Sequence, residues 1–192
     1  GVKDIFLAYN LVGPNIDRAA RFLRAFPEVK LAVTADDGLM IAELSEAMSA
    51  AQTKIFVLLD LDPGLHRTGV LPGSYAAELY QQIVDAPSLE PGGFHLYDGH
   101  NHQTNLQDRT VAVMTVWDAA AKLRDDFVRR DWPVPAIVCG GTGSFPIFVL
   151  FPFLFPAPLP VSAFTEDNAL LQSFLWHNQF SGPSWSTRRV VP

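Results

Sequence analysis

Two short segments of this chain gather residue types that bind anions. Arg67 lies in the glycine-flanked segment 62–69, and the segment 140–144 reads Gly-Gly-Thr-Gly-Ser. Arginine can hold a phenolate or carboxylate through directed hydrogen bonds. Glycines let backbone N–H groups approach an anion, and Thr142 and Ser144 add hydroxyl donors. The segments could hold a phosphate and a second anionic group, although a plain glycine turn and a surface ion pair of Arg67 are the structural alternatives.

The segment 95–102 holds three of the five histidines. His95 and Tyr97 share one face of a strand because side chains alternate along it, and Tyr97 could equally be a core aromatic. His100 and His102 form an H-x-H pair, which suits zinc together with His95 and Asp98. The spacing fixes no complete ligand set, so hydrogen-bonded loop histidines explain it more simply and we expect no metal ion.

Apolar periodicity predicts five strands alternating with four helices. The strands are expected at 4–8, 31–34, 54–61, 93–97 and 135–139, and the helices at 15–26, 37–51, 74–84 and 104–128. Asn15 is expected to cap the first helix. Repeated βα units predict a parallel sheet, either an open doubly wound sheet or part of a (β/α)8 barrel. In both architectures the site lies at the carboxyl ends of the strands, where the three segments fall.

Length and composition favour one α/β domain with an appended tail. Residues 1–148 carry the periodic pattern, whereas 149–192 are expected to form an irregular, proline-rich tail. A closed barrel usually takes about 250 residues, so we expect a partial (β/α)8 TIM-type barrel of about five strands, truncated at both ends. Open sheet edges would then promote self-association or homo-oligomer formation.

Charge and cysteine usage exclude several classes of protein. The net charge of −6 gives no basic footprint for nucleic acid, and the single cysteine, Cys139, suits a reducing, cytoplasmic setting. The stretch 132–165 carries no charge, but its prolines argue against a membrane-spanning helix, since each interior proline costs a helix about 3 kcal/mol.

Four segments of the chain, taken in order, carry a family resemblance. Residues 4–14 read DIFLAYNLVGP, residues 60–70 read DLDPGLHRTGV, residues 93–100 read GFHLYDGH and residues 140–146 read GGTGSFP. Over residues 2–148 the chain resembles fold-type III pyridoxal-phosphate enzymes of the alanine racemase N-terminal-domain superfamily. Within that superfamily it is most similar to the D-threonine aldolase and D-serine dehydratase group, which implies a (β/α)8 barrel followed by a β domain.

The resemblance implies roles for eight residues. Arg67 would bind the phenolic oxygen of pyridoxal phosphate, and Tyr97 would lie against its pyridine ring. The phosphate would be held by Thr142, Gly143 and Ser144, and the substrate side would be lined by His95, Asp98 and His100. The implied substrate is a small D-amino acid.

Two departures from the family pattern bear on activity. The family's Schiff-base lysine ends a strand that would precede Gly1, and none of the four lysines here lies at a predicted strand's carboxyl end. The divalent metal of the intact family is bound in a C-terminal β domain that nothing after Phe148 resembles. We therefore expect a fragment of a D-amino-acid lyase, inactive as this chain. The alternatives are an amino-acid racemase of the same fold, a metal-dependent hydrolase using His95, Asp98, His100 and His102, and a non-catalytic partner-binding module.

Overall fold

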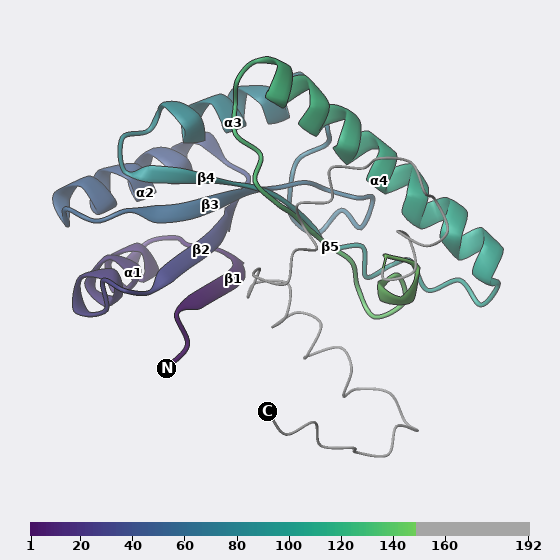
Figure 1. Ribbon diagram of the computed structural model, residues 1–192, viewed down its shortest axis with the longest axis horizontal. Helices are drawn as coiled ribbons and strands as arrows, with labels where there is room; N and C mark the ends of the chain where they lie inside the picture. Colours follow the sequence, from purple (N-terminus) through teal and green to yellow (C-terminus); the bar gives the residue numbers. More distant parts are fainter. Residues whose placement is uncertain (149–192) are drawn as a thin grey trace.

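A single parallel sheet, in strand order β1-β2-β3-β4-β5, organises the chain in a computed structural model that describes residues 1–148 (Figure 1). The elements are β1 (Asp4–Asn10), α1 (Pro14–Ala25), β2 (Lys30–Ala35), α2 (Gly38–Ala50), β3 (Ile55–Asp60), α3 (Ser74–Asp85), β4 (Leu89–Leu96), α4 (Leu106–Arg129) and β5 (Ile137–Cys139). Sequential strand order with right-handed crossovers puts the helices on one face, as in a barrel wall, whereas a doubly wound sheet reverses its order. The predicted partial barrel of five parallel strands is confirmed.

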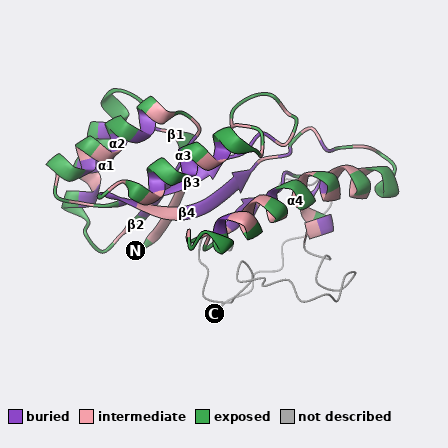
Figure 2. Cartoon of the chain, turned by 90° about the horizontal axis from the view of Figure 1, so that it is seen from above, coloured by how far each residue is buried: buried purple, intermediate pink, exposed green. Residues whose placement is uncertain are grey.

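The convex face of the sheet carries the main hydrophobic core. Alternate residues of β3, namely Ile55, Val57 and Leu59, are fully buried there against the helices. Tyr80 of α3 stacks on Phe127 of α4, with ring centroids 4.9 Å apart. Figure 2 shows β3 and β4 largely buried, with helices whose outer sides are exposed. This packing fixes the curvature and register on which the site depends.

The opposite, concave face changes character along the strands. A small apolar cluster of Ala32, Leu58 and Val138, with Phe6 and Phe56 packed against it, occupies its middle. Towards the carboxyl ends, positions of the same parity become polar: Thr34, Asp36, Asp60 and His95. Buried polar side chains need partners, so this edge must contain a hydrogen-bond network.

Two of the predicted element boundaries were wrong. Asn15 does not cap α1; Gly13 does, because the fixed φ of Pro14 suits the first helical position. Strand β4 begins at Leu89, four residues before its predicted start, although Pro91, Gly92 and Gly93 resemble a turn. A register shift between Val57 and Leu58 accommodates Pro91. Gly93 has φ +96, and a Cβ there would lie 1.9 Å from the carbonyl oxygen of Ala136.

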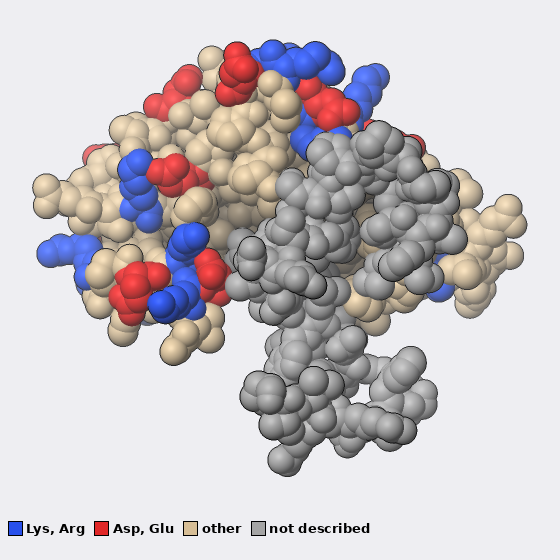
Figure 3. All heavy atoms as spheres, in the orientation of Figure 1, with Lys and Arg blue, Asp and Glu red and all other residues tan. Residues whose placement is uncertain are grey.

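The surface drawn in Figure 3 mixes charges of both signs. On the carboxyl-terminal part of α4, for example, Arg129 and Arg130 pair with Asp126. None of the helices formed by the described residues is long and apolar enough to cross a membrane. The tail expected at 149–192 lies outside the described residues.

Candidate functional site

Asn10, Thr34 and Asp36 join the carboxyl ends of β1 and β2. The Thr34 hydroxyl donates to Asn10 Oδ1 at 2.6 Å, and Asn10 Nδ2 donates to Asp36 Oδ1 at 2.5 Å. The other oxygen of Asp36 accepts a 2.7 Å hydrogen bond from the Gly69 amide, 33 residues away. Asp36 therefore ties the first two strands to the loop that carries Arg67.

The Arg67 loop has a backbone that few sequences could adopt. Gly64, His66 and Gly69 have φ values of +101, +55 and +89. At Gly69 a Cβ would lie 2.7 Å from the Asp62 nitrogen and 2.8 Å from the Leu61 carbonyl carbon, so only glycine fits. The loop continues the sheet in one place, because Leu61 bridges Val70 in parallel.

The Asp62 carboxylate organises the first half of this loop. It accepts hydrogen bonds from the Gly64 and His66 amides and from the His66 ring, at 2.7 to 3.0 Å. Burial of Asp62 acts to raise its pKa, but these hydrogen bonds and the charge of His66 outweigh burial and hold the pKa below its ordinary value. The loop is thus preorganised around an ionised carboxylate.

The loop brings Arg67 over the ring of Tyr97, which follows β4. The Arg67 guanidinium carbon lies 4.8 Å from the Tyr97 ring centroid, within cation–π range. Both residues line a small pocket together with Asp60, Leu61, Pro63, Leu65 and Thr68. The chain segments 60–68 and 97 therefore meet, as their positions after neighbouring strands predicted.

Asp98 joins the loop after β4 to the glycine-rich loop after β5. Only 2% of Asp98 is exposed, and its carboxylate accepts from the Ser144 hydroxyl at 2.5 Å and from Asn101 Nδ2 at 3.1 Å. Ser144 Oγ also accepts from the Gly141 amide at 2.8 Å. Asp98 and the Ser144 hydroxyl therefore hold the two loops together. That leaves neither side chain free for an outside ligand in this arrangement.

The glycine-rich loop still offers donors that fit a phosphate. The amides of Thr142 and Gly143 have no hydrogen-bond partner among residues 1–148, and Thr142 is exposed. Gly143 must be glycine, because a Cβ would lie 2.2 Å from the Asn101 carbonyl oxygen. Two adjacent unpaired amides in a glycine loop are a suitable cradle for an anion.

His95 forms a buried pair with Asp60 of the neighbouring strand. His95 Nδ1 lies 2.7 Å from Asp60 Oδ1, and both side chains are 6% exposed. The β3–β4 register pairs the two residues directly, so both side chains lie on the concave face. The sequence analysis did not single out Asp60 as a site residue. Its even spacing from Phe56 and Leu58 along the strand nevertheless marks it as facing the same, inner side of the sheet.

His100 and His102 follow on the loop that leads to α4. The His100 ring approaches the Arg67 loop, since a Cβ built on Gly64 would lie 3.6 Å from His100 Nε2. His100 Nδ1 is enclosed without a hydrogen-bond partner among the described residues. Within the described residues no three His, Cys, Asp or Glu side chains are grouped to hold a metal ion. The hydrolase alternative therefore gains no support from the placement of His95, Asp98, His100 and His102.

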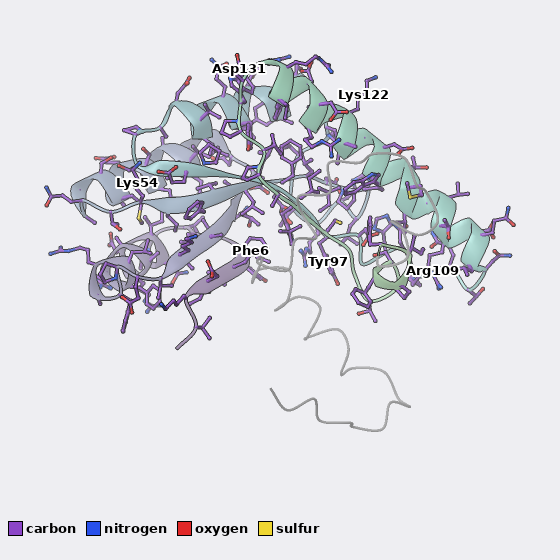
Figure 4. All side chains as sticks on the ribbon, viewed as in Figure 1. Phe6, Lys54, Tyr97, Arg109, Lys122 and Asp131 are labelled. Carbon is purple, nitrogen blue, oxygen red and sulfur yellow. The ribbon has the colours of Figure 1, made fainter. Side chains whose placement is uncertain are left out.

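The four lysines lie away from this edge. Lys3 and Lys54 precede β1 and β3, Lys30 opens β2, and Lys122 lies within α4. Figure 4 shows Lys54 at the far end of the sheet and Lys122 on α4, both distant from Tyr97. In this structure no lysine accompanies Arg67 and Tyr97.

Comparison with known proteins places these features in a family. Residues 13–141 match the family model described as "Alanine racemase, N-terminal domain". A 3-hydroxy-D-aspartate aldolase of Paracoccus denitrificans (strain Pd 1222) is 30% identical over 148 residues, which are 76% of this chain and 38% of the relative. A D-threonine aldolase of an Arthrobacter species is 29% identical over 149 residues, covering 75% of this chain and 38% of the relative.

A solved structure agrees with these sequence matches. The crystal structure of D-threonine aldolase from Filomicrobium marinum superposes with a TM-score of 0.70 and 27% identity, over 76% of this chain and 39% of that one. The chain thus spans about two-fifths of the length of the curated relatives that it matches.

Proposed function

Because this chain belongs to the alanine racemase N-terminal domain family of fold-type III pyridoxal-phosphate enzymes, we propose that it binds pyridoxal phosphate as part of a lyase of D-3-hydroxyamino acids. The observation that carries the proposal is the Arg67–Tyr97 contact at the carboxyl edge of the sheet, beside the glycine-rich loop. When bound, the cofactor supplies an electron sink for bond cleavage at the amino acid's α-carbon. The two aldolase relatives support a lyase rather than a racemase.

Three parts of the cofactor, namely its phenolic oxygen, its pyridine ring and its phosphate, would each meet a different part of the site. Arg67 would bind the phenolic oxygen through its planar guanidinium. Tyr97 would lie against the pyridine ring. Arg67 must then leave the face of the Tyr97 ring that it now covers. The phosphate would take the free amides of Thr142 and Gly143, while Ser144 contributes by holding the loop to Asp98.

The end of β4 and the loop that follows it would form the substrate side of the proposed site. His95 and His100 would face the D-amino acid, and Asp98 would act through the loops that it joins. Small-molecule binding requires neither nucleic acid nor a membrane. The single cysteine, Cys139, is free and is consistent with a cytoplasmic protein.

The positions of the lysines limit what the chain can do. None is near Arg67 and Tyr97 in the described structure, so we propose reversible cofactor binding without a lasting covalent bond and no lyase activity of the chain alone. The metal of the intact family is not assigned to any residue described here.

Titration with pyridoxal phosphate, followed by borohydride reduction and mass spectrometry, tests the proposal. We expect saturable binding that Arg67→Ala weakens, with no stoichiometric pyridoxyl adduct. Absence of saturable binding would contradict the cofactor assignment. A single adduct on Lys3, Lys30, Lys54 or Lys122 would contradict the claim of reversible binding.

A further inference from the structure

The buried pair of Asp60 and His95 is not required by the fold around it. The neighbouring positions on the concave face are the apolar Leu58 and Val138, which pack without polar groups. Burying a carboxylate and an imidazole is costly, and a well-packed apolar pair commonly serves stability as well or better. The pair is therefore better explained by its place at the edge of the pocket, which Asp60 lines together with Arg67 and Tyr97.

We propose that Asp60 is a positioning residue that keeps His95 protonated at Nδ1, so that Nε2 is the ring's hydrogen-bond acceptor. A carboxylate can only accept, so the 2.7 Å contact requires the proton on Nδ1. The ring of Phe6 also restrains the imidazole through an edge-type contact, in which the two ring centroids lie 5.5 Å apart and the ring planes meet at 64°. Asp60 and Phe6 thus fix both the tautomer and the orientation of the ring.

The other ring nitrogen is left for a ligand. His95 Nε2 has no hydrogen-bond partner in the part of the chain that the structure describes, and it is not among the enclosed unpaired atoms. The next step rests on the proposed function. In a 3-hydroxy-D-amino acid bound to the cofactor, the hydrogen-bond donor that the cofactor does not engage is the hydroxyl on the β-carbon. We therefore assign His95 Nε2 as the acceptor for the β-hydroxyl of a 3-hydroxy-D-amino acid, with Asp60 acting through His95.

Nitrogen NMR of the imidazoles tests the tautomer without any cofactor. In long-range proton–nitrogen spectra near pH 8 we expect a protonated Nδ1 and an unprotonated Nε2 for His95, assigned by loss of its signals in His95→Gln. Asp60→Asn should shift the ring towards the Nε2-protonated form, because the amide can donate to Nδ1. Glu90→Gln, which removes a carboxylate at the far end of the same strand, should change nothing. An Nε2-protonated ring in the unsubstituted protein would overturn the proposal.

Binding of two stable analogues tests the assignment to the hydroxyl. Phosphopyridoxyl-D-threonine and the same adduct of D-2-aminobutyrate differ only in the β-hydroxyl and need no lysine. We expect the unsubstituted protein to bind the threonine adduct about tenfold more tightly, as one net hydrogen bond allows. Asp60→Asn and His95→Gln should both lose that preference and bind the two adducts equally well.

The two proposals fail in different ways. If pyridoxal phosphate and both adducts fail to bind, the proposed function is wrong, whatever the His95 tautomer. If pyridoxal phosphate binds but the two adducts bind equally well, the cofactor assignment stands and the role of Asp60 and His95 is overturned. Equal loss of affinity for all three ligands in Asp60→Asn would show a merely structural role and would also overturn it.

Discussion

The guanidinium of Arg67 lies 4.8 Å from the ring centroid of Tyr97 and covers one face of that ring. The contact joins the loops after β3 and β4 at the place that we propose for the cofactor's pyridine ring. Arg67 itself is exposed and forms no hydrogen bond or ion pair with the described residues, so the stack is a readily broken arrangement. Ligand binding would exchange this contact for one between Arg67 and an anionic oxygen.

Arg67→Lys should weaken pyridoxal-phosphate binding roughly tenfold, because an ammonium cannot reproduce the guanidinium's planar donor geometry. The free energy of unfolding should change by less than about 0.5 kcal/mol, as is usual for exposed positions. Fluorescence titration and urea denaturation measure the two effects. Arg21→Lys on the exposed side of α1 is the matched control and should leave both unchanged. Unchanged affinity beside a large loss of stability would favour a structural role for Arg67.

Substitutions of the neighbouring residues Asp36 and Asp37 should differ in their effects on cofactor affinity. Asp36→Ala removes the acceptor of the Gly69 amide and of Asn10, so it should cost about 1–3 kcal/mol and also weaken cofactor binding. Asp37→Ala removes only the side-chain cap of α2, worth about 1 kcal/mol, and should leave cofactor affinity intact. Equal effects of both substitutions on affinity would show that Asp36 does not position the Arg67 loop.

Gly69→Ala should be strongly destabilising. The substitution combines a φ of +89 with a Cβ 2.7 Å from the Asp62 nitrogen, so the loop backbone must shift. We expect a loss of about 2–4 kcal/mol in urea denaturation. A Cβ at Gly73, in the same connection, would meet none of the described residues within 4 Å, so Gly73→Ala should cost less than about 1 kcal/mol. A Gly69→Ala protein as stable as Gly73→Ala would mean that the loop adopts another conformation.

The lowered pKa of Asp62 predicts a loss of stability in acid. A group whose pKa is lower in the folded than in the unfolded state contributes stability above the unfolded value, near 3.8, and loses that contribution as the pH falls through the folded value. Protonation of Asp62 should therefore lower the free energy of unfolding at pH values below about 4. Asp62→Asn should flatten that part of the profile measured by denaturation between pH 2.5 and 6. An unchanged slope would show that the carboxylate is not stabilised by the loop.

The edge strand β1 predicts self-association. Among the described residues β1 pairs only with β2, and Leu7 and Tyr9 are 42% and 72% exposed. Unpaired edge backbone beside exposed apolar side chains favours association. Size-exclusion chromatography with light scattering should show species larger than the 21.1 kDa chain, and Leu7→Lys with Tyr9→Lys should reduce them. A monomer at all concentrations would mean that this edge is covered.

Local pattern alone determined the alternation of strands and helices, the parallel sheet and the edge at which the candidate residues lie. Arg67, Tyr97 and the segment 140–144 were expected at that edge because each ends or follows a predicted strand, and strand ends and turns are local features. The start of β4 was missed because Pro91, Gly92 and Gly93 act as breakers in isolation. They are accepted in the sheet only through a register shift and the close approach of Ala136.

Which polar side chains meet was decided only by the tertiary structure. Asp36 reaches Gly69 over 33 residues, Asp60 reaches His95 over 35, and Asp98 reaches Ser144 over 46. Each contact depends on strand register, and register is set by the packing of the whole sheet against its helices. The sequence predicted that the Ser144 hydroxyl would be a phosphate ligand, whereas in the fold that hydroxyl binds Asp98. The amides of Thr142 and Gly143 have no hydrogen-bond partner among residues 1–148, and they are the donors that we propose for the phosphate.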